Sequence, residues 1–160
     1  MFVKINRTIT KSPTKNYFCL LDFTSKKSEN REVELFKTLC PRLSTVIEKR
    51  NDISSVENSI NLSRLIQYYP YDDGYLITAY NMYSRKSLKG DFLDYNALEV
   101  NLNMLKEFMD RYNIDVACSS DIAKHFKSNK TDIINIFDSV FKDSRNIIYM
   151  CKPMRIFTNK

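Results

Sequence analysis

Glycine is scarce in this sequence: its 160 residues contain only Gly74 and Gly90. In a chain that alternates strands and helices, a strand-to-helix loop is the usual place for a phosphate site. Glycine serves there because backbone amides approach an anion closely only where no Cβ intervenes. The loop Ser119–Lys130, "SSDIAKHFKSNK", follows an apolar stretch and precedes a helix-like one, yet it contains no glycine. An ordinary phosphate cradle is therefore not expected in this loop.

Paired cysteines and multiple histidines are also missing. There is no C-x-x-C pair, and His125 is the only histidine, so the sequence argues against a zinc site and no metal is expected. The cysteines are far apart, mostly within apolar runs, and are expected to be buried free thiols in a reducing compartment. They are Cys19, Cys40, Cys118 and Cys151.

Long apolar runs are absent as well. The start, "MFVKINRTIT", is too short and too polar for a signal peptide, and no run approaches the roughly 18 residues that span a bilayer. We expect a cytoplasmic protein without membrane association.

Hydrophobic content of 43% and charged content of 28% suit one folded domain over residues 1–160, with a short polar tail at 153–160. A net charge of +6 permits an anionic partner but does not require one.

The hydrophobic pattern alternates between strand and helix periods. Strands are predicted at 2–5, 17–23, 114–118 and 146–151, and helices at 29–40, 43–49, 94–112 and 133–141. The runs 60–69 and 74–83 predict a hairpin, with Asp73-Gly74 as its turn signal. Asp94 is placed to cap a helix on which Leu98, Leu102, Leu105, Met109 and Tyr112 share the core face. This order predicts an α/β fold with a mixed sheet between two layers of helices.

Three stretches carry a resemblance to a known family. The segments "GYLITAYNMYSRKS" and "DYNALEVNLNMLKEFMDRYNIDVA" match a strand followed by a Tyr-x-x-Leu helix, and "IFDSVFKDSRNIIYMC" matches a closing helix and strand. The chain resembles a macrodomain, the ADP-ribose-binding fold. The branch implied is the minimal one that includes terminal ADP-ribose protein glycohydrolase and ADP-ribose-phosphate phosphatases. The implied fold is a three-layer α/β/α sandwich.

The ligand loops depart from the family pattern. Glu29 and Arg31 fall where the first loop would have glycines, and Ile122 and Lys124 where the second would. A side chain at such a position fills the space of the pyrophosphate. In many members an acidic residue in or just after the second loop assists hydrolysis, but the matching residues 126–129 contain no carboxylate. The resemblance therefore implies a site that has lost the usual ADP-ribose chemistry.

Basic residues of the two loops are a second functional clue. In a macrodomain-like fold they would border one cleft and form a rim that attracts an acidic protein surface, a nucleotide or an RNA backbone. The alternative is two solvated lysine-rich loops. The rim residues are Lys26, Lys27, Arg31, Lys124, Lys127 and Lys130.

Candidates for catalysis are few, and each has a plain structural alternative. His125 could be a general base, but no Ser or Cys is placed as its nucleophile, so a surface histidine is the alternative. Asp22 ends a predicted strand and could instead cap the loop that follows. The other candidates are Lys124 and Asp132, the latter only if the loop is allowed to slip.

The stretch "YYPYDDGY" places aromatic residues beside acids. This composition suits a protein interface, or else a hairpin whose tyrosines pack on the sheet. The interface candidates are Tyr68, Tyr69, Tyr71 and Tyr75.

Three functions remain open from the sequence. The first is a non-enzymatic, degenerate macrodomain, a pseudoenzyme without a cofactor that binds a protein partner or an anionic ligand. Small Lys- and Asn-rich macrodomains look like products of viruses, phages or AT-rich bacteria. A viral or phage source implies the host cytoplasm and a role in host takeover or against a defence. The second is an ADP-ribosyl hydrolase or ADP-ribose-phosphate phosphatase with rebuilt loops. The third is a weak nucleic-acid binder that uses the basic rim.

Overall fold

Six strands form a single mixed sheet in the computed structural model, which describes residues 1–22, 31–49, 66–82, 93–124 and 128–154. The strands are β1 (Phe2–Ile5), β2 (Tyr17–Asp22), β3 (Ile66–Tyr71), β4 (Gly74–Met82), β5 (Val116–Ser119) and β6 (Ile148–Cys151). Their order across the sheet is β1-β6-β5-β2-β4-β3. Only the β3–β4 pair is antiparallel, and the other four pairs are parallel. The predicted mixed sheet is confirmed.

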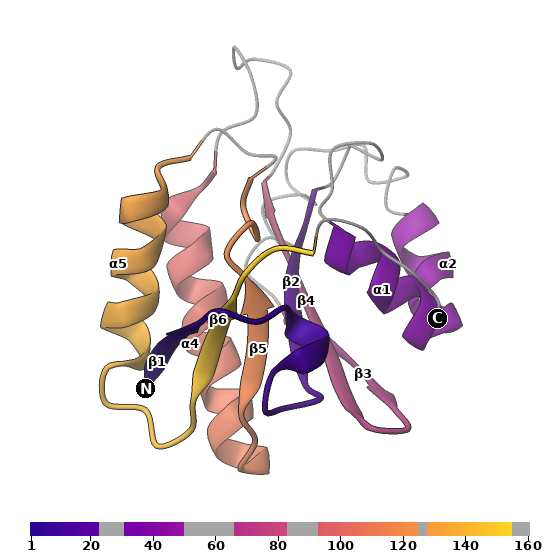
Figure 1. Cartoon of the computed structure of the whole chain (residues 1–160). Helices are drawn as coiled ribbons and strands as arrows, with labels where there is room; N and C mark the ends of the chain where they lie inside the picture. The colour runs from indigo at the N-terminus through magenta and orange to yellow at the C-terminus, as the bar shows by residue number, and fades with distance from the viewer. Residues whose placement is uncertain (23–30, 50–65, 83–92, 125–127, 155–160) are drawn as a thin grey trace, which may run out of the picture.

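Helices cover both faces of this sheet (Figure 1). They are α1 (Arg31–Leu39), α2 (Pro41–Lys49), α4 (Tyr95–Tyr112), α5 (Lys130–Phe141) and a short 3-10 turn, η1 (Ile9–Lys11). One buried cluster joins the sheet to α4 and α5, and a second joins its other face to α1 and α2. Strand β2 contributes to both clusters because its side chains alternate between the two faces. The run 17–23, predicted as a strand, therefore contains β2, which is buried on both faces of the sheet.

The long helix α4 begins as its sequence predicts. The Asp94 carboxylate accepts a hydrogen bond from the Ala97 N–H at 3.0 Å, which pairs one of the free amides of the first turn. Leu98, Leu102, Leu105 and Met109 are fully buried. Tyr112, expected on the same core face, is instead 42% exposed because it is the last residue of the helix.

The hairpin lies where it was predicted, but its turn is shifted by one residue. Tyr71 pairs with Gly74, so the two loop residues are Asp72 and Asp73, and Gly74 already belongs to β4. Helix α1 ends at Leu39 and α2 starts at Pro41, two residues before the predicted start at 43. The missing N–H of Pro41 would have had no partner within the helix.

Candidate functional site

The carboxyl ends of three parallel strands meet at one edge of the sheet. Strands β2, β5 and β6 run in the same direction, so Asp22, Ser119 and Cys151 all end at this edge. The N-terminus of α1 is drawn to the same edge by a contact between Glu32 and the segment that follows β6. In open α/β sheets the carboxyl edge is the general position for a ligand. We therefore treat these residues as the candidate site.

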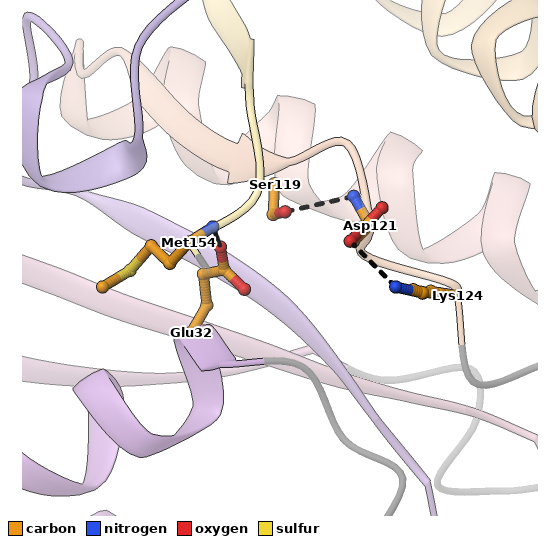
Figure 2. A network of polar contacts seen from close by, with 5 residues as sticks. All are labelled: Glu32, Ser119, Asp121, Lys124 and Met154. Atoms are coloured by element: carbon orange, nitrogen blue, oxygen red, sulfur yellow. Dashed lines mark hydrogen bonds and ion pairs between the residues drawn. The ribbon is translucent and has the colours of Figure 1, made fainter. Parts of the chain in front are cut away.

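Glu32 is the most unusual side chain at this edge. It lies in the first turn of α1, yet it is only 2% exposed. Its Oε1 accepts a hydrogen bond from the Met154 N–H at 3.1 Å, and no described residue donates to its buried Oε2 with hydrogen-bond geometry, although the Ser119 hydroxyl lies near the carboxyl. Figure 2 shows this carboxyl together with Ser119, whose Oγ accepts a hydrogen bond from the Asp121 N–H at 3.1 Å. A buried carboxyl oxygen without a partner is costly and calls for an explanation.

Burial is the main cause of the shifted pKa of the Glu32 carboxyl. Loss of solvent raises the pKa of this carboxyl, and the charge of Asp121 raises it further. The Met154 N–H, its own backbone N–H and the Ser119 hydroxyl act in the opposite direction and lower it, but they do not outweigh burial. The neighbouring Cys151 thiol has its pKa raised to about 12, first by burial and then by Glu32. The Cys151 thiol is therefore a poor nucleophile at neutral pH.

The raised pKa of Glu32 makes a prediction for stability. The folded chain binds this proton more tightly than the unfolded chain. The stabilisation is therefore complete below the unfolded pKa and is lost as pH rises through the folded pKa. We expect Glu32→Gln to remove this part of the pH dependence while keeping an acceptor for the Met154 N–H. Urea unfolding at pH values from about 4 to 8, where carboxyls with a raised pKa titrate, measures the pH dependence of the free energy of unfolding for both proteins. Identical pH profiles for the two proteins would contradict the prediction.

The turn after β5 contains two of the positions where the resemblance expects glycine. Ile122 donates its N–H to the Ser119 carbonyl and Lys124 donates its N–H to the Asp121 carbonyl, so the chain makes two successive tight turns. Among the described residues other than glycine, only Asn113 has a positive φ. The turn therefore has a backbone that any residue can adopt. Ile122 is 1% exposed and belongs to the core cluster under α4 and α5.

Charges around this turn are balanced within the described part of the chain. Lys124 Nζ lies 3.7 Å from Asp121 Oδ2, an exposed ion pair of the kind that contributes little to stability. Arg31 and Lys130, the other described members of the predicted basic rim, are exposed, as is Asp132. Lys26, Lys27 and Lys127 lie outside the described residues. The rim stays a prediction.

The remaining predicted site residues are placed as follows. Arg31 is the first residue of α1, and Asp132 lies in the first turn of α5, where its charge favours the helix N-terminus. Asp22 ends β2, but its side chain is not described. Glu29 and His125 lie outside the described residues. The structure thus brings the first turn of α1 and the turn after β5 together through Glu32 and Asp121.

The hairpin tyrosines divide between packing and exposure. Tyr69 is buried with the Arg42 guanidinium 5.6 Å from its ring centre, and the Tyr71 hydroxyl donates to the Lys15 carbonyl at 2.6 Å. Tyr75 packs edge-on against Phe108. Tyr68 is 48% exposed and joins the same aromatic cluster, so this residue keeps the exposure that an interface needs.

Other expectations concern cysteines, metals and membranes. All four cysteines are free and buried, as predicted. Within the described ranges, His, Cys, Asp and Glu side chains form no group of three or more that could hold a metal ion. No helix among the described residues is long and apolar enough to cross a membrane.

Sequence reasoning overlooked Glu32, although a signal was present. Glu32 lies four residues before Phe36 and seven before Leu39, which places it on the apolar stripe of α1. A charged residue inside such a stripe indicates either a buried acid or a boundary of the buried face. The prediction concentrated on the two glycine positions that precede it, Glu29 and Arg31, and not on this pattern.

Comparisons with known proteins place the fold. No protein-family model matches the sequence, and no curated protein matches it. Among solved structures, the chain is similar to the macrodomain of Mycobacterium tuberculosis DarG, with a TM-score of 0.69 and 12% identity over 96% of this chain and 98% of that one. The macrodomain of Thermus aquaticus DarG gives a TM-score of 0.68 and 8% identity over 96% and 99% of the two chains.

A third similar structure contains a ligand. Thermosipho africanus DarTG in complex with ADP-ribose has a TM-score of 0.67 and 8% identity, and the match covers 98% of this chain and 43% of that one. At such identities the similarity concerns the fold, and function has to be argued from the site.

Proposed function

We propose that this chain, whose fold is that of a macrodomain, is a binding protein without hydrolase activity that acts through a protein partner. The observation that carries the proposal is the turn after β5. Ile122 and Lys124 occupy the positions where the resemblance expects glycine, and the turn has ordinary negative φ values. A phosphate cradle needs close backbone approach that Cβ atoms at these positions obstruct.

The two acids nearest the turn after β5 support the same proposal. Asp132 is exposed in the first turn of α5, and Asp121 is paired with Lys124. An exposed carboxylate and a carboxylate in a surface ion pair both differ from a general base, which is usually oriented by a buried partner. The biological setting proposed is that of a viral or phage factor acting on a host protein.

A hydrolase is the second candidate, because Glu32 is a buried acid with a raised pKa at the edge where a ligand would bind. Acids of this kind can serve as general acids. Incubation of the natural chain with ADP-ribosylated protein and with ADP-ribosylated DNA separates the two candidates. We expect no release of ADP-ribose above a heat-inactivated control. Release by the natural chain that Glu32→Gln abolishes would replace the binding protein with the hydrolase.

The partner surface proposed is the exposed aromatic cluster. Tyr68 and Tyr112 are 48% and 42% exposed, and both rings pack on Phe108, with centroids 4.9 and 4.7 Å away. Tyrosines that are held by neighbouring rings are typical centres of protein interfaces.

We expect Tyr68→Ala with Tyr112→Ala to leave the fold intact and to weaken partner binding by about 2 kcal/mol or more. Capture from the cells in which the protein is made, using the natural and the double-variant chain, measures this. Glu99→Ala, an exposed change elsewhere on α4, is the matched control. A partner retained equally by all three chains would place the interface elsewhere.

A further inference from the structure

The first turn of α1 is a position where the fold favours an anion. The first four N–H groups of a helix have no partner within it, and they carry the positive end of the helix dipole. This helix end is tied, through Glu32 and Met154, to the edge where β2, β5 and β6 terminate. A helix N-terminus at the carboxyl edge of parallel strands is a general anion site.

The carboxyl of Glu32 itself lies there. Glu32 is the second residue of α1 and its side chain is turned into the protein, 2% exposed. The groups that favour its ionised form are the Met154 N–H, which donates to Oε1 at 3.1 Å, its own backbone N–H and the Ser119 hydroxyl. Backbone amides and hydroxyls are the donors that typically hold a bound phosphate or carboxylate.

Nothing in ordinary helix packing calls for this arrangement. Glu34, two residues further on, is exposed and lies 3.6 Å from Lys37 Nζ, as surface glutamates commonly do. Glu32 instead keeps a buried Oε2 for which the described part of the chain provides no hydrogen-bond partner. A second anion would meet this carboxyl and also Asp121, which is near enough to raise the pKa of Glu32. The Lys124 ammonium, paired with Asp121, is 75% exposed and faces outward.

We propose that the buried Glu32 side chain occupies the anion position at this edge, so that Glu32 determines specificity by excluding phosphate-bearing ligands. The inference rests on the proposed function, and it adds a cause separate from the missing glycines. The side chains at the two glycine positions prevent close backbone approach to a phosphate. Glu32 fills the space that the phosphate would occupy and, in its ionised form, adds a like charge. Removing Glu32 should therefore open an anion site that the natural chain does not offer.

Two substitutions separate the charge of Glu32 from its volume. Glu32→Gln removes the charge, keeps the size and keeps an acceptor for the Met154 N–H, whereas Glu32→Ala removes both charge and volume. Glu34→Gln is the control, because it removes a charge from the exposed face of the same helix. Inorganic pyrophosphate is the probe, and amide chemical shifts of Asp121 and Met154 report binding at this edge. Circular dichroism establishes that each variant folds.

We expect no saturable shift for the natural chain or for Glu34→Gln. The affinity of Glu32→Ala should rise by about tenfold or more, which corresponds to the loss of one close like-charge contact. A gain in both Glu32 variants identifies charge as the cause of exclusion, and a gain in Glu32→Ala alone identifies volume. Either result supports the proposal, and should Glu32→Ala fail to fold, Glu32→Gln alone decides.

Pyrophosphate binding by the natural chain at this edge would overturn the proposal, and so would folded variants that gain nothing. Neither outcome bears on hydrolysis, which is judged separately by the release of ADP-ribose from modified protein and DNA. The two proposals can therefore fail independently.

Discussion

Replacing Phe137 with alanine is expected to lower the free energy of unfolding by about 3–5 kcal/mol. Phe137 is fully buried in the cluster that joins α4 and α5 to the sheet. Its ring centre lies 5.7 Å from that of Phe2 on β1 and 6.2 Å from that of Phe141, so truncation leaves a cavity between the helix and the edge strand. Domains are typically stable by only about 5–15 kcal/mol, so the loss is a large share of the total.

Urea unfolding monitored by circular dichroism measures the Phe137 effect. Asp138→Ala is the matched control, since this neighbour on α5 is exposed and should change stability by less than about 0.5 kcal/mol. Phe137→Leu should fall between the two because it leaves a smaller cavity. Equal stability for Phe137→Ala and Asp138→Ala would mean that α5 does not pack on the sheet as described.

The second large loss is expected for Gly74→Ala, at the start of β4. A Cβ on Gly74 would lie 2.5 Å from Asn16 Oδ1 and 2.9 Å from the Lys15 carbonyl oxygen. Neither atom can retreat easily, because Asn16 Oδ1 accepts a hydrogen bond from the Tyr75 N–H at 2.9 Å and the other atom is backbone. Overpacking of this kind costs about 1–3 kcal/mol, and we expect the upper part of that range.

Thermal unfolding of Gly74→Ala against Asp73→Ala tests this prediction. Asp73 is the exposed turn residue immediately before Gly74, and its replacement removes no packed atom. We expect the midpoint to fall by several degrees only for Gly74→Ala, since about 1 kcal/mol corresponds to a few degrees in a domain of this size. An unchanged unfolding midpoint in both variants would show that Gly74 does not pack closely against residues 15 and 16.

The elements of the fold were predictable because their signals are local and repeated. The run 17–23 is apolar at consecutive positions, and β2 is indeed buried on both faces of the sheet. Asp94 precedes an apolar stripe of helical period, and it caps α4. The turn of the hairpin was misplaced by one residue because Asp-Gly is a strong turn signal, while the register of β3 and β4 depends on packing across the whole pair.

The candidate site was only partly predictable. The glycine positions drew attention to Arg31, Ile122 and Lys124, which the structure places at the start of α1 and in the turn after β5. The decisive contact was not visible in the sequence, because the Met154 N–H meets Glu32 across a separation of 122 residues. Long-range contacts of single polar groups leave no periodic pattern. Only the position of Glu32 on an apolar stripe hinted at its burial.

The missing glycines and the internal carboxyl have the same consequence. Side chains at Ile122 and Lys124 remove the close backbone approach that a pyrophosphate requires, and the Glu32 carboxyl lies in the first turn of the neighbouring helix. A macrodomain fold with both features is expected to keep its scaffold and to lose the usual ligand. Surfaces outside this edge, such as the exposed Tyr68 and Tyr112, then become the natural place for a partner.

Calorimetric titration of the natural chain with ADP-ribose tests this account most directly. We expect no saturable heat at ADP-ribose concentrations up to the millimolar range. That concentration is about a thousand times the micromolar dissociation constants that metabolite sites often show. Binding with a micromolar dissociation constant would contradict it, because these turns would then hold the pyrophosphate without glycine and beside the Glu32 carboxyl.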